Sequence, residues 1–309
     1  MSARRQPARA PRKKASASKA PTQDQLAEIE RVAVELANLA GAEITNALGG
    51  IMAVKYKGSK AAEQMWQDPV SEVDHRIEQL IRSRLGDKFP HHGIIGEEFE
   101  DQEGDAESFT WAVDPVDGTT NFVNGFPLCA AAIGVLYAGK PVVGALWCGA
   151  SHTLRPGVYH ASAGGKLRFN NDEVTPRNNP AVRRRLAGVP RPIPGRGGWE
   201  TRKTGSAAIE CAFVAAGTLN AARFERPNIW DIAGGLALLE AAGGKALVEA
   251  DGEWVPFERF EPPQIEGKRG KLREWHPPLI IGRGSTRDLV AGFNLESNGG
   301  EGGRIHPAK

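Results

Sequence analysis

Two aspartates stand three residues apart in the stretch WAVDPVDGTTNF, residues 111–122, where an apolar run ends. Pro115 fixes the backbone dihedral φ and is expected to break the strand, and Gly118 permits a conformation that other residues resist. Because such a turn can aim both carboxylates at one point, Asp114 and Asp117 could bind a cation together. Asp, Pro and Gly are also common turn formers, so this segment alone is equally consistent with a simple turn.

Acidic side chains stand at the ends of other apolar elements as well. The run GIIGEE ends in Glu97 and Glu98, and Asp231 opens the predicted helix WDIAGGLALLEAAGG. Buried carboxylates that converge need a compensating cation, and hard divalent cations such as Mg²⁺ accept oxygen ligands. The amides of Gly118 and Thr119 would begin a helical turn, which attracts phosphate oxygens. The alternatives are a helix cap at Asp231, a solvated glutamate pair, and a helix cap at Ser71-x-x-Asp74.

This set of segments resembles the inositol monophosphatase family of Mg²⁺-dependent, lithium-sensitive phosphatases. GEE (96–98), WAVDPVDGTTNF and WDIAGGLALLEAAGG match its acidic motif and its two signature regions, and DPVSEVD (68–74) is similar to the segment ahead of them. The likeness covers residues 25–295 in the family's order. It implies an α/β (α+β) fold, namely a layered αβαβα sandwich of the sugar-phosphatase type, and a homodimer.

The resemblance implies two Mg²⁺ ions, and a third, weaker ion reached through water. Glu97, Asp114 and the carbonyl of Val116 would bind the first ion, whereas Asp114, Asp117 and Asp231 would bind the second. Glu97 would reach the third. The implied reaction is hydrolysis of a small phosphomonoester, because metal coordination lowers the pKa of a bound water that can then attack phosphorus.

The resemblance also implies catalytic and phosphate-binding roles. Glu97, Thr119 and Asp74 would hold and orient the attacking water in line with the ester bond. The amides of Gly118 and Thr119 would cradle the phosphate.

The substrate side carries a weaker likeness. The segment GSAA (205–208) resembles the family's Gly-Thr-Ala segment, which implies that Ser206 and Ala207 contact the sugar alcohol. Glu225 lies six residues before Asp231, where the family has a substrate-contacting glutamate seven residues before its aspartate. The segment 260–278 is longer than expected before the last strand.

Inositol monophosphate is the substrate that the resemblance favours. The alternatives within the same enzyme class are a histidinol-phosphate phosphatase, a 3′(2′),5′-bisphosphate nucleotidase and a fructose-1,6-bisphosphatase. The stretch DGTTNF favours the inositol type, because the histidinol-phosphate type more often has Lys-Ser after Gly-Thr.

The elements that position these residues are indicated by capping and by hydrophobic spacing. Thr22 and Gln25 fit a capping box, which predicts a helix from there to Gly49-Gly50. A second helix is predicted to start near Ser71 and to close at Gly86. The residues expected to form its buried stripe are Val73, Ile77, Leu80 and Ile81.

The remaining sequence predicts a mixed α/β chain in two halves. The segment 129–148 predicts two antiparallel strands, MAVKYKG (52–58) another strand, 58–68 a mobile loop and 150–200 irregular structure. GSAAIECAFVAAG and WDIAGGLALLEAAGG predict helices, and PLIIG a buried strand. We expect an N-terminal α+β half over 24–165 with most metal ligands. A C-terminal α/β half over 166–309 would contribute Asp231 and substrate contacts.

The composition is that of an ordinary globular chain with a basic N-terminal tail. Of 309 residues, 25% are charged and 40% apolar, and residues 1–23 hold seven basic residues and no acidic one. Such a tail is expected to be disordered. A non-enzymatic alternative is therefore an RNA-associated accessory protein, binding weakly through this tail in a salt-sensitive manner.

Cysteine content and hydropathy point to the cytoplasm. Cys129, Cys148 and Cys211 are odd in number and apolar in setting, which predicts reduced, buried thiols. No run of apolar residues is long enough to predict a membrane span.

Overall fold

The computed structural model describes residues 20–48, 54–56, 69–105, 108–176, 181–183, 185–191 and 199–293. Most of the predicted basic tail, the Gly49-Gly50 helix end and the whole loop predicted over 58–68 lie outside these residues.

The first sheet has seven strands in the order β3-β4-β5-β6-β7-β8-β9. Its first pair is parallel and the others are antiparallel, so the strand pair predicted over 129–148 is confirmed. β8 and β9 extend this sheet past residue 165. The prediction of irregular structure over 150–200 is wrong for Gly157–Ser162, which form β7 and pair with β6. The bounds are β3 Gly93–Gly96, β4 Phe109–Asp117, β5 Ala130–Tyr137, β6 Lys140–Cys148, β7 Gly157–Ser162, β8 Arg168–Phe169 and β9 Asp172–Glu173.

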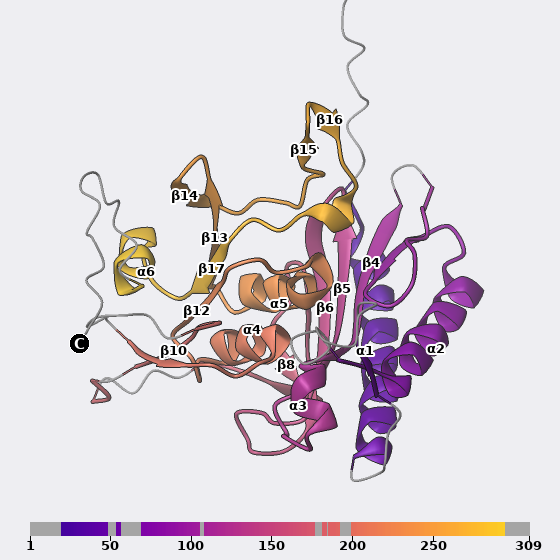
Figure 1. Cartoon of the computed structure of the whole chain (residues 1–309), viewed down its shortest axis with the longest axis horizontal. Coiled ribbons are helices and arrows are strands. Elements are labelled where there is room, and N and C mark those ends of the chain that lie inside the picture. The colour runs from indigo at the N-terminus through magenta and orange to yellow at the C-terminus, as the bar shows by residue number, and fades with distance from the viewer. Residues whose placement is uncertain are drawn as a thin grey trace, which may run out of the picture.

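Two long helices, α1 (Gln23–Ala47) and α2 (Glu72–Lys88), cover the outer face of the first sheet (Figure 1). The predicted capping box is confirmed, because the Gln25 amide donates to Thr22 Oγ1 at 3.2 Å and Gln25 Oε1 accepts from the Thr22 amide at 2.9 Å. Leu80 is 37% exposed, so its predicted burial is wrong, and Leu85 continues the buried stripe at a spacing of four. No helix within the described ranges is both long and apolar enough to cross a membrane.

A second sheet has six strands in the order β11-β10-β12-β17-β13-β14. Helices α4 (Ala207–Ala216) and α5 (Ile229–Ala241) lie between the two sheets, and α6 (Thr286–Gly292) packs on the outer side of the second (Figure 1). The predicted αβαβα sandwich is therefore confirmed. The strand bounds are β10 Leu186–Gly188, β11 Glu200–Arg202, β12 Ala221–Phe224, β13 Lys245–Ala250, β14 Glu253–Pro256 and β17 Leu279–Gly282.

The shorter elements lie at the edges of these layers. β1 and β2 form an antiparallel pair, β15 and β16 form a small hairpin, and α3 follows β4 directly. Their bounds, with those of one short 3₁₀ helix, are β1 Val54–Tyr56, β2 Pro69–Ser71, α3 Thr119–Val123, β15 Gln264–Ile265, β16 Lys268–Arg269 and η2 Leu272–Glu274.

The three cysteines lie in the core, as the sequence predicts. All three are free and buried, and burial raises the pKa of each thiol. A buried thiol with a raised pKa is a poor nucleophile and metal ligand. The cysteines therefore act as small apolar residues in this fold.

Helix α5 approaches the first sheet unusually closely, because glycines face each other across the contact. A Cβ atom on Gly144 of β6 would lie 2.1 Å from the carbonyl oxygen of Gly234 in α5. A Cβ atom on Gly134 of β5 would lie 2.4 Å from the amide nitrogen of the same residue. Gly234 thus lets α5, which also carries Asp231, lie close against β5 and β6.

We expect Gly144→Ala to push α5 away from the sheet and to lower the free energy of unfolding by about 1–3 kcal/mol through overpacking. Gly86→Ala in α2 is the matched control, because its Cβ would meet nothing within 4 Å and alanine favours a helix. Urea denaturation of both variants makes the comparison. Equal stability of Gly144→Ala and the parent chain would contradict the close approach.

Candidate active site

Strand β4 carries both aspartates of the DPVD turn. The strand continues through Pro115 to Asp117, so the predicted strand break is wrong. Asp114 pairs with Ala132 and Asp117 with Ala130, which leaves one extra residue in β4 and forms a β-bulge. Side chains three residues apart in a regular strand point to opposite faces. The extra residue shifts this alternation, so Asp114 and Asp117 can point to the same side. Proline is tolerated there because a bulge leaves one residue outside the ladder of hydrogen bonds.

Gly118 turns the chain from β4 into α3. Its backbone lies in the left-handed region, with φ 85° and ψ 41°, as predicted from its type. A Cβ atom there would also lie 3.1 Å from the carbonyl oxygens of Gly205 and Leu128. Both the conformation and the limited space therefore favour glycine at this turn, and α3 begins directly after it.

A pocket of about 250 Å³ forms where β4, the β3–β4 connection, α3 and α5 meet. It brings together seven of the residues that the sequence singles out. Sequence reasoning did not assign Thr120 or Gly205 to it, although Gly205 belongs to the GSAA segment. The described lining consists of Glu97, Asp114, Val116, Asp117, Gly118, Thr119, Thr120, Gly205 and Asp231.

Asp117 is held against the start of α4. Its carboxylate accepts hydrogen bonds from the Ser206 hydroxyl, from the Ala208 amide at 2.7 Å and from the Ala207 amide at 3.3 Å. Burial nevertheless raises its pKa to about 6, and these hydrogen bonds oppose that rise. A carboxylate has about four lone-pair positions, so one remains for another ligand.

Asp114 and Asp231 face the same accumulation of negative charge. Burial raises the pKa of Asp114, and the charges of Glu97, Asp117 and Asp231 raise it further. Burial and the charge of Asp117 also raise the pKa of Asp231, although the Asn228 amide donates to it at 2.8 Å. Asn228, and not Asp231, is the N-cap of α5. The capping alternative is thus only partly right, since Asp231 both supports the cap and lines the pocket.

Thr119 connects the pocket to α2. Its hydroxyl lies 2.9 Å from the Val116 carbonyl oxygen and 3.3 Å from Asp74 Oδ1. A hydroxyl has one proton, so it can donate to only one of these acceptors at a time. Asp74 is 1% exposed and lies behind Thr119, outside the pocket lining.

The predicted substrate contacts are not all brought to the pocket. Ser206 and Ala207 bond to Asp117 and lie behind it, outside the described lining. Glu225 is also outside that lining and forms a two-oxygen ion pair with Arg191, whose hydrogen bonds lower the pKa of Glu225. Arg191 is 34 residues away in sequence, so no local pattern signals this partner.

The pocket has the donor chemistry of a hard cation site. Neighbouring negative charges help to raise the pKa of Asp114, Asp117 and Asp231, and no lysine or arginine is among the described residues that line the pocket. Carboxylate and carbonyl oxygens are the ligands that Mg²⁺ prefers. Within the described part of the chain, no three acidic, histidine or cysteine side chains converge closely enough to hold one metal ion as they stand. The oxygen donors thus suit Mg²⁺ in type. In this geometry, however, the side chains would have to move closer together to bind one ion.

Helix α4 carries another buried carboxylate, that of Glu210. It is 4% exposed, and burial raises its pKa to about 7, although Thr204 donates to it at 2.8 Å. The folded state therefore binds this proton more tightly than the unfolded chain, whose glutamate titrates near 4.5. The resulting stabilisation is complete below that value and is lost as the pH rises through about 7.

Titration of Glu210 should lower the unfolding free energy of the parent chain by up to a few kcal/mol between about pH 5 and pH 8. We expect Glu210→Gln to lack this decrease. Urea denaturation across this range measures the effect. Glu253→Gln on β14 is the control, because Glu253 is exposed. A pH profile of Glu210→Gln parallel to that of the parent chain would show that Glu210 titrates normally.

The fold and the pocket together define a class of protein, the layered α/β phosphatases of the sugar-phosphatase type. Residues 25–275 match the sequence model of the Inositol monophosphatase family. The chain belongs to this family and is a phosphomonoesterase at that level. The family depends on Mg²⁺, which agrees with the oxygen donors in the pocket.

Individual relatives support the same membership. Inositol monophosphatase 1 of Bos taurus is 32% identical over 68% of this chain and 79% of the relative. A fructose-1,6-bisphosphatase/inositol-1-monophosphatase of Aquifex aeolicus is 29% identical over 67% of this chain and 81% of the relative. Among solved structures, the extragenic suppressor protein suhB of Bartonella henselae has a TM-score of 0.67 at 26% identity, covering 88% of this chain and 99% of that one.

Proposed function

We propose that this chain hydrolyses a small phosphomonoester, inositol monophosphate first among the candidates, in a Mg²⁺-dependent reaction. The observation that carries the proposal is the pocket that four acidic residues line together with Val116 and the first residues of α3. Negative side chains alone would repel a phosphate. A pocket of this charge beside the start of α3 is suited to a phosphate only when cations lie between the carboxylates and the phosphate.

The proposed metal ligands are the oxygen donors of the pocket. Glu97, Asp114 and the Val116 carbonyl would hold one Mg²⁺, and Asp114, Asp117 and Asp231 would hold a second. A third, weaker ion near Glu97 remains part of the proposal. When bound, the ions would lower the pKa of a water and neutralise charge on the phosphoryl oxygens.

Thr119, Asp74 and Glu97 are proposed to orient the attacking water. Support comes from the Thr119 hydroxyl, which lines the pocket while Asp74 Oδ1 lies 3.3 Å from it on the far side. If Asp74 accepts the hydroxyl proton, a lone pair of Thr119 Oγ1 is left facing the pocket to accept from water. The amides of Gly118 and Thr119 would bind the phosphate oxygens.

The substrate alcohol is the least determined part of the proposal. Ser206 and Ala207 are proposed to act on the substrate only through Asp117, whose carboxylate they hold in place. The ion pair of Glu225 with Arg191 would compete with any contact between Glu225 and the substrate. The Aquifex relative named for two sugar phosphates supports keeping fructose-1,6-bisphosphate as an alternative substrate. Histidinol phosphate and 3′(2′),5′-adenosine bisphosphate remain the others.

A phosphate-release screen over these substrates, with glycerol phosphates added, tests the proposal. We expect hydrolysis of inositol monophosphate with Mg²⁺, inhibition by Li⁺ and loss of activity with a chelator. Hydrolysis of none of these esters would overturn the proposed function. Preference for another ester would keep the phosphatase and replace its substrate.

We also propose that the enzyme is a cytoplasmic homodimer. Three free, buried cysteines support a reducing compartment, and the family resemblance supports the dimer. Light scattering of the purified chain measures the oligomeric state directly.

A further inference from the structure

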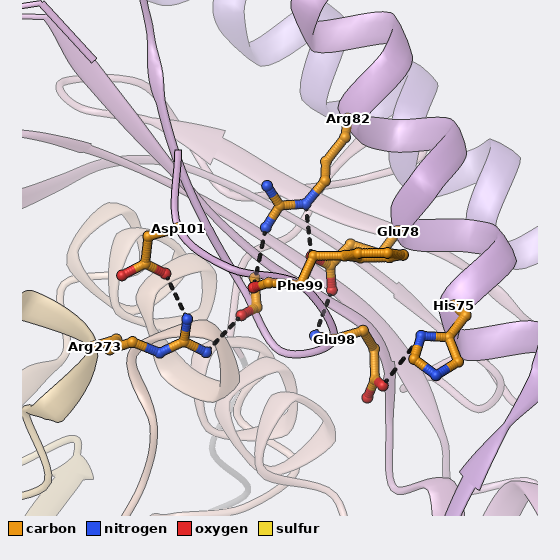
Figure 2. Close-up of polar contacts among 8 residues, drawn as sticks. His75, Glu78, Arg82, Glu98, Phe99, Asp101 and Arg273 are labelled. Atoms are coloured by element: carbon orange, nitrogen blue, oxygen red, sulfur yellow. Dashed lines mark hydrogen bonds and ion pairs between the residues drawn. The ribbon is translucent and has the colours of Figure 1, made fainter. Parts of the chain in front are cut away.

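The segment that carries Glu97 is anchored from one side by α2. Glu78 is fully buried, and its Oε2 accepts from the Glu98 amide at 2.8 Å while its Oε1 accepts from Arg82 Nε at 2.8 Å (Figure 2). Gly96 leaves the room for this arrangement, because a Cβ atom there would lie 2.0 Å from Glu78 Oε1. The backbone next to Glu97 is therefore fixed on its α2 side.

Arg273 holds the same segment from the opposite side. Its Nη2 donates to the Gly96 carbonyl oxygen at 3.3 Å, and its Nη1 donates to Asp101 Oδ1 at 2.9 Å (Figure 2). These two acceptors lie on either side of Glu97 in sequence. Arg273 belongs to η2, within the segment 260–278 that is longer than expected from the family resemblance.

The same guanidinium also contacts the segment that carries Asp231. Its Cζ lies 5.4 Å from the ring centre of Trp230, the residue before Asp231. Trp230 is 7% exposed, and its indole nitrogen has no hydrogen-bond partner among the described residues. The ring is therefore held by packing and by its contact with Arg273. Arg273 thus contacts residues adjacent to both Glu97 and Asp231, two proposed metal ligands that come from different layers of the fold.

We propose that Arg273 is a positioning residue that keeps Glu97 and Asp231 facing one pocket. The inference rests on the proposed function, because it concerns the two ligands at opposite ends of that site. A planar guanidinium can donate in two directions and stack on an aromatic ring at once, which a lysine cannot reproduce. Residues that orient metal ligands typically affect metal affinity by 10–100-fold when removed.

Mg²⁺ binding measured by calorimetry without substrate, together with the Mg²⁺ dependence of phosphate release, tests this role. We expect Arg273→Met to weaken Mg²⁺ binding by about 10–100-fold, while turnover at saturating Mg²⁺ falls much less. Asp101→Ala, which removes one of the three contacts, should give a smaller loss in the same direction. Arg31→Met is the matched control, because Arg31 forms an exposed ion pair with Glu35 in α1.

Unchanged Mg²⁺ affinity in Arg273→Met would overturn the positioning role, as would an equal loss in Arg31→Met. If Arg273→Met does not fold, Arg273→Lys decides, because it keeps the charge and loses the two-directional contact. Weakened Mg²⁺ binding in that variant supports the inference, and parent-like binding overturns it. Absence of Mg²⁺ binding by the parent chain would instead reject the proposed function itself.

Discussion

Asp117→Asn is expected to fold like the parent chain and to lose about a hundredfold or more of its turnover. The side chain keeps its size and can still accept from the Ala208 amide, and removal of a buried charge relieves its desolvation. What the variant loses is the negative charge that the pocket directs at a cation. Phosphate release under saturating Mg²⁺ and substrate measures turnover, and thermal unfolding without Mg²⁺ measures folding.

Asp172→Asn is the control for this variant, because Asp172 is exposed on β9 at the far edge of the same sheet. We expect it to retain parent turnover. If Asp117→Asn also turned over at nearly the parent rate, Asp117 could not be a metal ligand and the proposed second ion would lose its support.

Removing the Thr119 hydroxyl has the second large expected effect. Thr119→Ala deletes the side-chain hydroxyl that contacts both Asp74 and the Val116 carbonyl oxygen, and it is expected to lower turnover by about a hundredfold. Thr119→Ser is the matched variant, because it keeps the hydroxyl and removes only a methyl group. Steady-state phosphate release should find Thr119→Ser within a few-fold of the parent chain.

The two Thr119 variants separate an orienting role from a packing role. An orienting hydroxyl predicts a loss in turnover with little change in the Michaelis constant, and rescue by serine. Equal losses in both variants would point instead to the methyl group and its packing, and would reject the proposed orientation of water.

Sequence signals succeeded where the physical cause is local. The capping box at Thr22 is visible in four consecutive residues, and Gly118 is recognised because a positive φ after a strand calls for glycine. The acidic residues at strand and helix ends are recognised as a set, since several converging carboxylates have few structural uses. The layered fold was predicted from the family resemblance that these segments carry. Most of the pocket lining was predicted as well, but Thr120 and Gly205 were not assigned to it.

Sequence signals failed where a distant segment decides the outcome. Pro115 is tolerated within β4 because β5 accommodates a bulge, which the proline itself does not reveal. Glu225 is drawn to Arg191, and β7 becomes regular only because β6 offers it an edge. The contacts of Arg273 with the Glu97 segment likewise join residues 172 and 177 positions apart.

The most direct test is hydrolysis of inositol monophosphate by the metal-stripped chain in water labelled with heavy oxygen, with and without added Mg²⁺. A metal-activated water predicts that phosphate release requires Mg²⁺ and that each released phosphate carries one labelled oxygen after a single turnover. Release at the full rate without Mg²⁺, or label found in the inositol instead of the phosphate, would contradict attack of a metal-activated water on phosphorus.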